Sequence, residues 1–184
     1  MNTGIISARY ARALLKYVLE TGNGDKVYSQ AVVIVLRMEE VRQLSAYLED
    51  HPVIIPEKKP QLLEAALGEE PAPELKNFLN LVIQRRRCGY FMRMMYSFIS
   101  QYRSEASIKV GRIVTAIPAE GLKEKLEEAF GNKTGAKVIL EEKVDPAIIG
   151  GFVFELDDWR MDASVRSHLE KIRNCLVETN NRIV

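Results

Sequence analysis

Side chains that could carry out acid–base chemistry occur in this sequence mainly as adjacent carboxylates. The pairs are Glu39-Glu40, Glu69-Glu70, Glu141-Glu142 and Asp157-Asp158. Adjacent residues do not face each other on a helix, and they point to opposite faces of a strand, so these pairs indicate solvated charge. No Ser, Cys or Lys has an evident base beside it that would activate a nucleophile. The pattern predicts a protein that is not an enzyme.

Two glycine-containing segments are the candidates for phosphate binding. Gly22-Asn-Gly24 lacks the third glycine of a dinucleotide loop, because position 27 is Val27, and Gly131-Asn-Lys-Thr134 lacks the Gly-Lys-Thr order of a P-loop. His168 and Cys175 share a helix face, but about 10.5 Å along the axis separates them, too far for one metal ion. We therefore expect turns at both segments, no cofactor and no metal.

Basic residues are concentrated in one part of the chain. The net charge is only +1, yet residues 84–112 hold seven basic residues against one acidic residue, starting with Arg85-Arg86-Arg87. A nucleic-acid or ribosome-associated adaptor that uses Arg85–Arg112 is the alternative function that this block allows. A helix C-terminus, whose dipole favours cations, explains the same arginines without a nucleic acid, and we expect none to bind.

The composition is that of a globular protein of a reducing compartment. Of its 184 residues, 47% are hydrophobic and 28% are charged, and the longest uncharged run, Val27–Leu36, has only ten residues. A membrane span needs about 20 apolar residues, so we expect no insertion into the membrane. The N-terminus lacks the basic region of a signal peptide, which predicts a chain that stays in the cytosol.

Two regions with different hydrophobic periodicity follow each other along the chain. Residues 1–105 have the pattern of successive helices and predict a six-helix bundle. The expected breaks are Gly22-Asn-Gly24, His51-Pro52, Gly68 with two prolines, and Gly89. Residues 106–184 mix strand-like and helix-like segments and predict a small α/β domain. The expected fold class is α+β, with a domain boundary near residue 105.

The second region has strong local signals. We expect strands at residues 108–117, 137–140 and 152–156, and helices at residues 121–130 and from residue 164 to about 178. The first of these helices should end at Gly131. Asp162 or Ser164 can cap the last helix. Gly150-Gly151 indicates a positive φ or a close approach of backbone at the entrance to a strand.

The predicted first helix has more apolar surface than one side of a bundle core needs. At about 100° per residue its apolar side chains cover an arc of about 240°, whereas packing on one side needs only about 100°. The face suited to the core consists of Ala8, Ala11, Leu15, Val18 and Leu19. The other face, formed by Tyr10, Ala13, Leu14 and Tyr17, fits the wall of a groove for a helix from another chain. A central helix buried on all sides would explain the same pattern.

Three segments of the chain resemble the δ subunit of bacterial F-type ATP synthases, the counterpart of the mitochondrial oligomycin-sensitivity-conferring protein. The first is Ala8-Arg-Tyr-Ala-Arg-Ala-Leu14. The second is Val144-Asp-Pro-Ala-Ile-Ile-Gly-Gly-Phe152, followed ten residues later by Asp162-Ala-Ser-Val-Arg-Ser-His-Leu169. The third is Asn77-Phe-Leu-Asn-Leu-Val-Ile83, which leads to Arg87. Motif order, length and two-part layout agree, so the resemblance covers essentially the whole chain.

The resemblance implies a non-catalytic stator subunit that joins the catalytic head to the membrane-anchored peripheral stalk, so that ion flow and ATP synthesis stay coupled. In this family the N-terminal bundle receives the N-terminal helix of an α subunit between its first and fifth helices. Here that site maps to Tyr10, Ala13, Leu14 and Tyr17 facing Phe78, Leu81 and Arg85. The C-terminal part engages a b-type stalk subunit, and the matching stripe is Val165, Leu169, Ile172 and Leu176.

The resemblance also implies where the protein works. Such a subunit is a peripheral part of the synthase complex at the cytoplasmic face of the cell membrane. It does not insert into the bilayer itself, and we expect the isolated chain to be a monomer.

Overall fold

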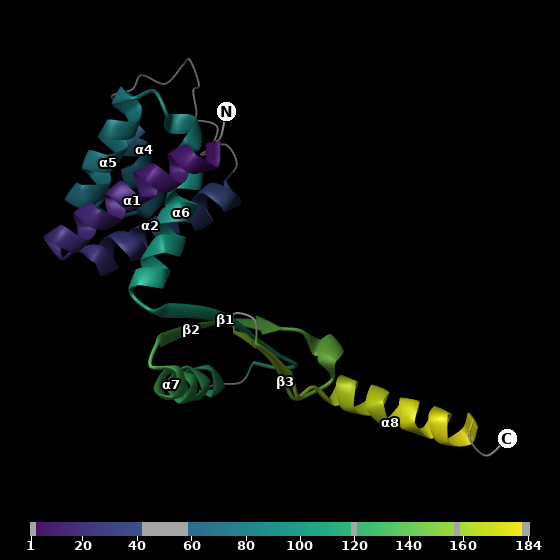
Figure 1. Cartoon of the computed structure of the whole chain (residues 1–184). Helices are drawn as coiled ribbons and strands as arrows, with labels where there is room; N and C mark the ends of the chain where they lie inside the picture. The colour runs from purple at the N-terminus through teal and green to yellow at the C-terminus, as the bar shows by residue number, and fades with distance from the viewer. Residues whose placement is uncertain (1–2, 42–58, 119–120, 157–158, 182–184) are drawn as a thin grey trace. The chain divides into compact units, whose positions relative to one another are not determined.

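A computed structural model describes residues 3–41, 59–118, 121–156 and 159–181. The chain divides into two compact units, Met1–Ala106 and Ser107–Val184. The first unit is built from helices and the second contains a four-stranded sheet with helices, as Figure 1 shows. The predicted α+β fold class is therefore confirmed.

The described part of the first unit consists of helices. Their bounds are α1 (Thr3–Thr21), α2 (Gly24–Glu40), α4 (Lys59–Leu67), α5 (Pro73–Gln84) and α6 (Phe91–Glu105), with a short 3-10 helix η2 (Cys88–Tyr90) before α6. The predicted break at His51-Pro52 lies outside the described residues. The described residues show five α-helices here, and the count of six stays a prediction.

Apolar residues at helical spacing close the core of this unit. In α2 the buried side chains recur every three or four residues, as the helical period requires. The largest fully buried side chains of the unit are Leu14, Ile34, Met38, Leu63, Leu75, Leu79, Phe91, Met94, Met95 and Phe98. Each of them comes from one of the α-helices, so these helices pack on one another without help from a strand.

The second unit is a mixed sheet with the strand order β2-β1-β3-β4. Its strands are β1 (Ile108–Thr115), β2 (Lys137–Val144), β3 (Phe152–Leu156) and β4 (Trp159–Asp162). β1 pairs in parallel with β2 and antiparallel with β3, which pairs antiparallel with β4. The helix α7 (Leu122–Thr134) connects the parallel pair, as such a pair requires. The 3-10 helix η3 (Pro146–Ile148) joins β2 to β3, and α8 (Val165–Asn181) follows β4.

Figure 1 shows the helix α7 below the strands, and its apolar side chains close a small core against the sheet. Phe130 of α7 stacks on Phe154 of β3 with ring centres 4.3 Å apart. Leu122 and Leu126 pack on the same core, whose buried members are Ile113, Val138, Leu140, Phe154 and Leu156.

Several predicted boundaries in the second unit are wrong. The helix expected to end at Gly131 continues to Thr134, because Gly135 is the residue that adopts the left-handed cap, with φ of 64°. The strand expected to end at Leu140 continues to Val144 as the edge strand β2, pairing with β1 along its whole length. The strand β4 was not predicted at all.

Candidate functional site

A groove with a volume of about 220 Å³ lies between α1 and α5 in the first unit. Its lining consists of Ala13, Leu14, Tyr17, Asn77, Phe78 and Leu81. Five of these six were predicted as partner-binding residues, from two helices more than sixty positions apart in sequence. The structure therefore brings together most of the residues predicted for this surface.

The groove has a buried floor and an exposed apolar rim. Leu14 and Phe78 are buried, whereas Tyr17 and Leu81 are 38% and 41% exposed. Ala13 between them is exposed and small, so the backbone of α1 is open to close approach by another chain. Tyr17 and Leu81 thus offer apolar surface that the first unit does not use for its own core.

Two positions of α1 depart from a clean division into a core face and a groove face. Leu14, expected on the surplus face, is buried, and Leu19, expected in the core, is exposed. Leu14 lies at the border of the two faces, so it serves both the bundle core and the floor of the groove. Leu19 lies near the C-terminal end of α1, on the border between its core face and its charged sector.

Tyr10, which was also predicted for this surface, packs against Phe78 of the groove floor. Its ring meets that of Phe78 edge to face, with centres 6.3 Å apart. Arg87 Nη1 donates a hydrogen bond of 3.1 Å to the Tyr10 hydroxyl, and the guanidinium lies 5.3 Å from the ring centre. Tyr10 is half-buried and does not line the groove.

Arg85 lies away from the groove lining. It is the residue at which α5 ends, where its backbone N–H donates to the carbonyl oxygen of Leu81 at 3.1 Å. The next residue, Arg86, has φ of 51° and turns the chain, so that Arg87 and not Arg85 contacts Tyr10. Arg87 is therefore the arginine that contacts a groove-supporting side chain, and a role of exposed Arg85 in partner binding stays a prediction.

Sequence reasoning missed Asn77, which lines the groove opposite Tyr17. Its Nδ2 donates a hydrogen bond of 3.3 Å to the Tyr17 hydroxyl across the two helices. Asn77 precedes Leu81 by one helical turn, and that spacing could have indicated it. The bond places a polar contact at one end of an otherwise apolar groove.

A buried carboxylate links the turn between α1 and α2 to the start of α5. Asn23, directly before α2, donates from Nδ2 to Glu74 Oε1 at 2.7 Å, and Glu74 lies in the first turn of α5. This hydrogen bond lowers the pKa of Glu74 despite its burial. The contact holds the two helices that form the groove in one relative position.

The basic block at Arg85–Arg112 does not form one free patch. Arg87 contacts Tyr10, and Arg103 Nε donates to the Tyr28 hydroxyl at 2.9 Å. Arg112 lies directly opposite Glu141 and Glu155 in the sheet. Two of these arginines thus contact tyrosines of the helical unit, and Arg112 faces acidic residues across the sheet.

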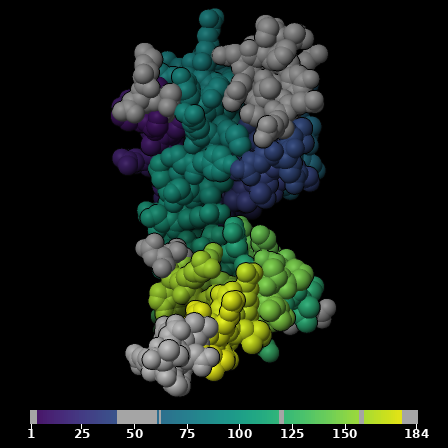
Figure 2. Space-filling view, turned by 90° about the vertical axis from the view of Figure 1, so that its right-hand side faces the viewer, coloured from purple at the N-terminus to yellow at the C-terminus, as the bar shows by residue number. Residues whose placement is uncertain are grey.

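The predicted stripe on α8 is exposed along its whole length. Val165, Leu169, Ile172 and Leu176 are between 40% and 64% exposed. Figure 2 shows α8, in yellow, on the surface of the second unit. The stripe is therefore not used by the sheet, and it is available to another chain.

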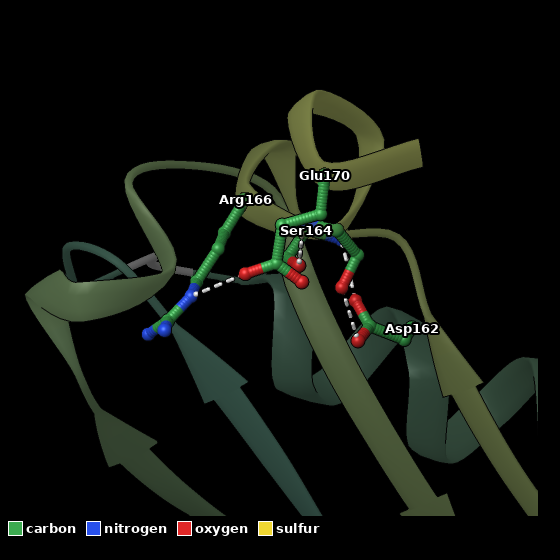
Figure 3. A network of polar contacts seen from close by, with 5 residues as sticks. Asp162, Ser164, Arg166 and Glu170 are labelled. Atoms are coloured by element: carbon green, nitrogen blue, oxygen red, sulfur yellow. Dashed lines mark hydrogen bonds and ion pairs between the residues drawn. The ribbon is translucent and has the colours of Figure 1, made fainter. Parts of the chain in front are cut away.

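A hydrogen-bonded cap sets the start of α8, as Figure 3 shows. The Ser164 hydroxyl accepts from the backbone N–H of Ser167 at 3.2 Å, and Asp162 Oδ1 accepts from the backbone N–H of Ser164 at 3.0 Å. Hydrogen bonds from Ser164 and Ser167 lower the pKa of Asp162 to about 2. Ser164 is therefore confirmed as the residue that caps the helix, while Asp162 holds Ser164 and the Ser167 hydroxyl in place. Arg166 and Glu170 form an ion pair of 3.2 Å on the helix surface.

The glycine pair before β3 is also confirmed as a site of close backbone approach. Gly151 has φ of 74°, and a side chain there would overlap the carbonyl oxygen of Ala163. The backbone N–H of Val165 donates to the Gly150 carbonyl at 3.0 Å. Gly150 and Gly151 thus hold the start of α8 against the turn that precedes β3.

Among the described residues, no group of three or more His, Cys, Asp or Glu side chains could hold a metal ion. The described helices also include none that is long and apolar enough to cross a bilayer.

The sequence as a whole matches the family model "ATP synthase delta (OSCP) subunit" over residues 6–176. The chain belongs to this family. It is 38% identical to the ATP synthase subunit delta of Phocaeicola vulgatus and 35% identical to that of Bacteroides fragilis, over the full length of both chains in each comparison. The predicted resemblance is therefore confirmed.

A solved structure shares the fold. A chain in the cryo-electron microscopy structure of the Toxoplasma gondii mitochondrial ATP synthase hexamer superposes with a TM-score of 0.62 at 19% identity, covering 93% of this chain and 97% of that one.

Membership of the family establishes the role of the chain in general terms. It is a non-catalytic stator subunit of F-type ATP synthase, a complex of ATP synthesis and proton transport. Membership of this family favours the stator role over the alternative of a nucleic-acid adaptor.

Proposed function

We propose that the subunit connects the catalytic head to the peripheral stalk through two surfaces, one on each unit. The helical unit, the predicted six-helix bundle of residues 1–105, binds the N-terminal helix of an α subunit. The α/β unit of residues 106–184 binds a b-type stalk subunit. Force from the head then passes through this chain to the stalk, and rotation stays coupled to ion flow.

The observation that carries the first half of the proposal is the groove between α1 and α5. It combines buried Phe78 as a floor, exposed Tyr17 and Leu81 as a rim, and small Ala13 beside them. An amphipathic helix binds such a groove with apolar side chains one turn apart. The hydrogen bond between Asn77 and Tyr17 adds a polar group at the rim, where interfaces are usually polar.

The exposed stripe of α8 supports the second half of the proposal. Four apolar side chains at helical spacing remain 40–64% exposed, and the cap at Ser164 fixes where the helix starts. A helix with one apolar face packs well against another helix with a matching face. A stalk built from b-type helices supplies such a face.

The position of the protein follows from these two contacts. We place it at the cytoplasmic face of the cell membrane, held there by its partners and not by insertion. The isolated chain is expected to be a monomer, because both apolar surfaces are shaped for other subunits.

A binding titration tests the α-subunit contact directly. The full chain is mixed with a peptide of the α-subunit N-terminus from the same synthase, and the heat of binding is measured. A complex of one peptide per chain, lost when Leu81 is changed to Asp, supports the groove. Equal binding by the wild-type chain and the Leu81→Asp variant would exclude it.

A further inference from the structure

Ile149 has an unusual backbone conformation at the end of η3. Its φ is 69° and its ψ is −41°, and the Gly150 N–H donates to the Ile148 carbonyl oxygen at 2.8 Å. These values describe a three-residue turn with positive φ at its centre, a rare and strained conformation. A β-branched residue such as isoleucine is an outlier there, because its Cβ substituents crowd the backbone.

Hydrogen bonds of the neighbouring residues hold Ile149 in this conformation. The Ile149 N–H donates to the Pro146 carbonyl at 3.0 Å, and Asp145 Oδ1 accepts from the Ala147 N–H at 3.0 Å. On the other side, the Gly150 carbonyl accepts from the Val165 N–H at 3.0 Å. The turn is thus fixed to the first residue of α8. Strained residues that the structure over-determines in this way are concentrated at functional sites.

The Ile149 side chain is not among those that pack on the described core of the second unit. Ile149 is 63% exposed, although it is large and apolar. The turn lies close to the stripe on α8, because a Cβ added to Gly150 would meet Val165 Cγ2 at 3.1 Å. Figure 1 shows this green turn next to the start of α8. An exposed apolar residue therefore stands beside the first residue of the exposed apolar stripe.

We propose that Ile149 is a binding residue for the stalk subunit, so that the stalk site extends from the α8 stripe onto the η3 turn. This inference rests on the proposed function of α8. The occupant is an apolar helical face of the b-type subunit that contacts Ile149 together with the start of α8. A stable interface buries roughly 800 Å² of each partner, so it needs contacts beyond the four side chains of one stripe.

The test compares stalk binding with stability in the full chain. The probe is the b-type subunit of the same synthase, purified without its membrane span. Asparagine lacks the branched Cβ that crowds the backbone at this φ, so Ile149→Asn should leave the melting temperature unchanged or higher while binding weakens about tenfold. Ile149→Leu, which keeps an apolar side chain, should bind close to the wild-type level. Ile117→Asn is the matched control, because Ile117 is also exposed in this unit, at 73%, and should bind as wild type does.

The outcomes separate this inference from the proposed function. Leu169→Asp serves as the reference variant on the stripe. If Leu169→Asp leaves binding unchanged, α8 is not the stalk site and the proposed function fails with the inference. If Leu169→Asp weakens binding but Ile149→Asn does not, only the role of Ile149 is overturned. A lower melting temperature of Ile149→Asn together with weaker binding would show that Ile149 is structural, and it would also overturn the inference.

Discussion

Arg87 makes two contacts with Tyr10, a residue that packs on the groove floor. Its guanidinium lies 5.3 Å from the Tyr10 ring centre, and its Nη1 donates a hydrogen bond of 3.1 Å to the Tyr10 hydroxyl. The pair links the turn after α5 to α1. Since the Tyr10 ring also meets Phe78, Arg87 holds a side chain that supports the groove floor. The arginine therefore acts on the groove without lining it.

Removing this arginine should destabilise the first unit modestly. Arg87→Ala loses one hydrogen bond and one cation–π contact, together about 1–2 kcal/mol. Chemical denaturation followed by far-UV circular dichroism measures the change. Arg85→Ala is the control, since exposed Arg85 should alter stability by less than about 0.5 kcal/mol. Equal losses for both variants would contradict a specific role of Arg87.

A large ring at the open part of α1 should block the groove without unfolding the protein. Ala13→Trp places the indole where a bound helix would lie, and we expect at least about 30-fold weaker binding of the α-subunit peptide. Ala65→Trp is the control, because Ala65 is exposed on α4, outside the groove. If Ala13→Trp instead costs about 1–3 kcal/mol of stability, the position belongs to the core.

The two faces of α1 show how far periodicity alone can predict a site. An α-helix has 3.6 residues per turn, so residues four apart, such as Ala13 and Tyr17, point in nearly the same direction. Periodicity therefore predicted both on the face opposite the core. The period does not decide border positions such as Leu14, whose burial depends on how closely α5 approaches. The backbone reversal at Arg86, which brings Arg87 to Tyr10, also depends on tertiary contacts.

In the second unit, too, features that depend on local sequence were predictable, and a feature that depends on contacts between distant segments was not. The cap at Ser164 was predictable because it depends on residues next to it in the sequence, and the glycine pair was predictable from the residue type, although the backbone it approaches at Ala163 is distant in sequence. The strand β4 was not, because its four residues are a strand only through pairing with β3. The α5 side of the groove, Phe78 and Leu81, could be assigned only through the family resemblance, which pairs the first and fifth helices.

The cap of α8 should lose its effect in acid. The pKa of Asp162 is lowered from 3.8 to about 2, so its ionised form stabilises the fold above about pH 4, and this contribution is lost as the pH falls toward 2. Asp162→Ala should therefore lower the melting temperature at pH 7 and have a smaller effect near pH 2.5. Fluorescence of Trp159 reports on this unit, since it is the single tryptophan of the chain. An equal effect at both pH values would show that the charge is not involved.

The helical unit should fold as an isolated fragment. The largest fully buried side chains of residues 1–106 all come from its own helices, so no strand is needed to close the core. A fragment of this size should unfold cooperatively with about 5–15 kcal/mol of stability. Thermal unfolding followed by circular dichroism measures this, and a gradual loss of weak helical signal would show that the unit depends on the rest of the chain.

Changing the exposed leucine of the groove should uncouple the synthase. Leu81→Asp puts a charge where an apolar helix binds, and because the charge would be desolvated in the complex, affinity should fall about 30-fold or more. The catalytic head does not need this subunit for chemistry, so isolated heads should hydrolyse ATP at the wild-type rate. Membranes carrying the variant should pump fewer protons for each ATP hydrolysed.

A matched variant separates the groove from a general effect of surface charge. Leu36 is exposed on α2, outside the groove, and Leu36→Asp should leave both activities unchanged. Proton pumping is followed by quenching of a pH-sensitive dye in inverted membrane vesicles, with ATP hydrolysis measured in the same preparation. Full pumping in Leu81→Asp membranes would mean that load reaches the stalk without the groove. Equal losses in both variants would point to assembly or stability, since only a contact specific to the α1–α5 groove predicts that the two leucines differ.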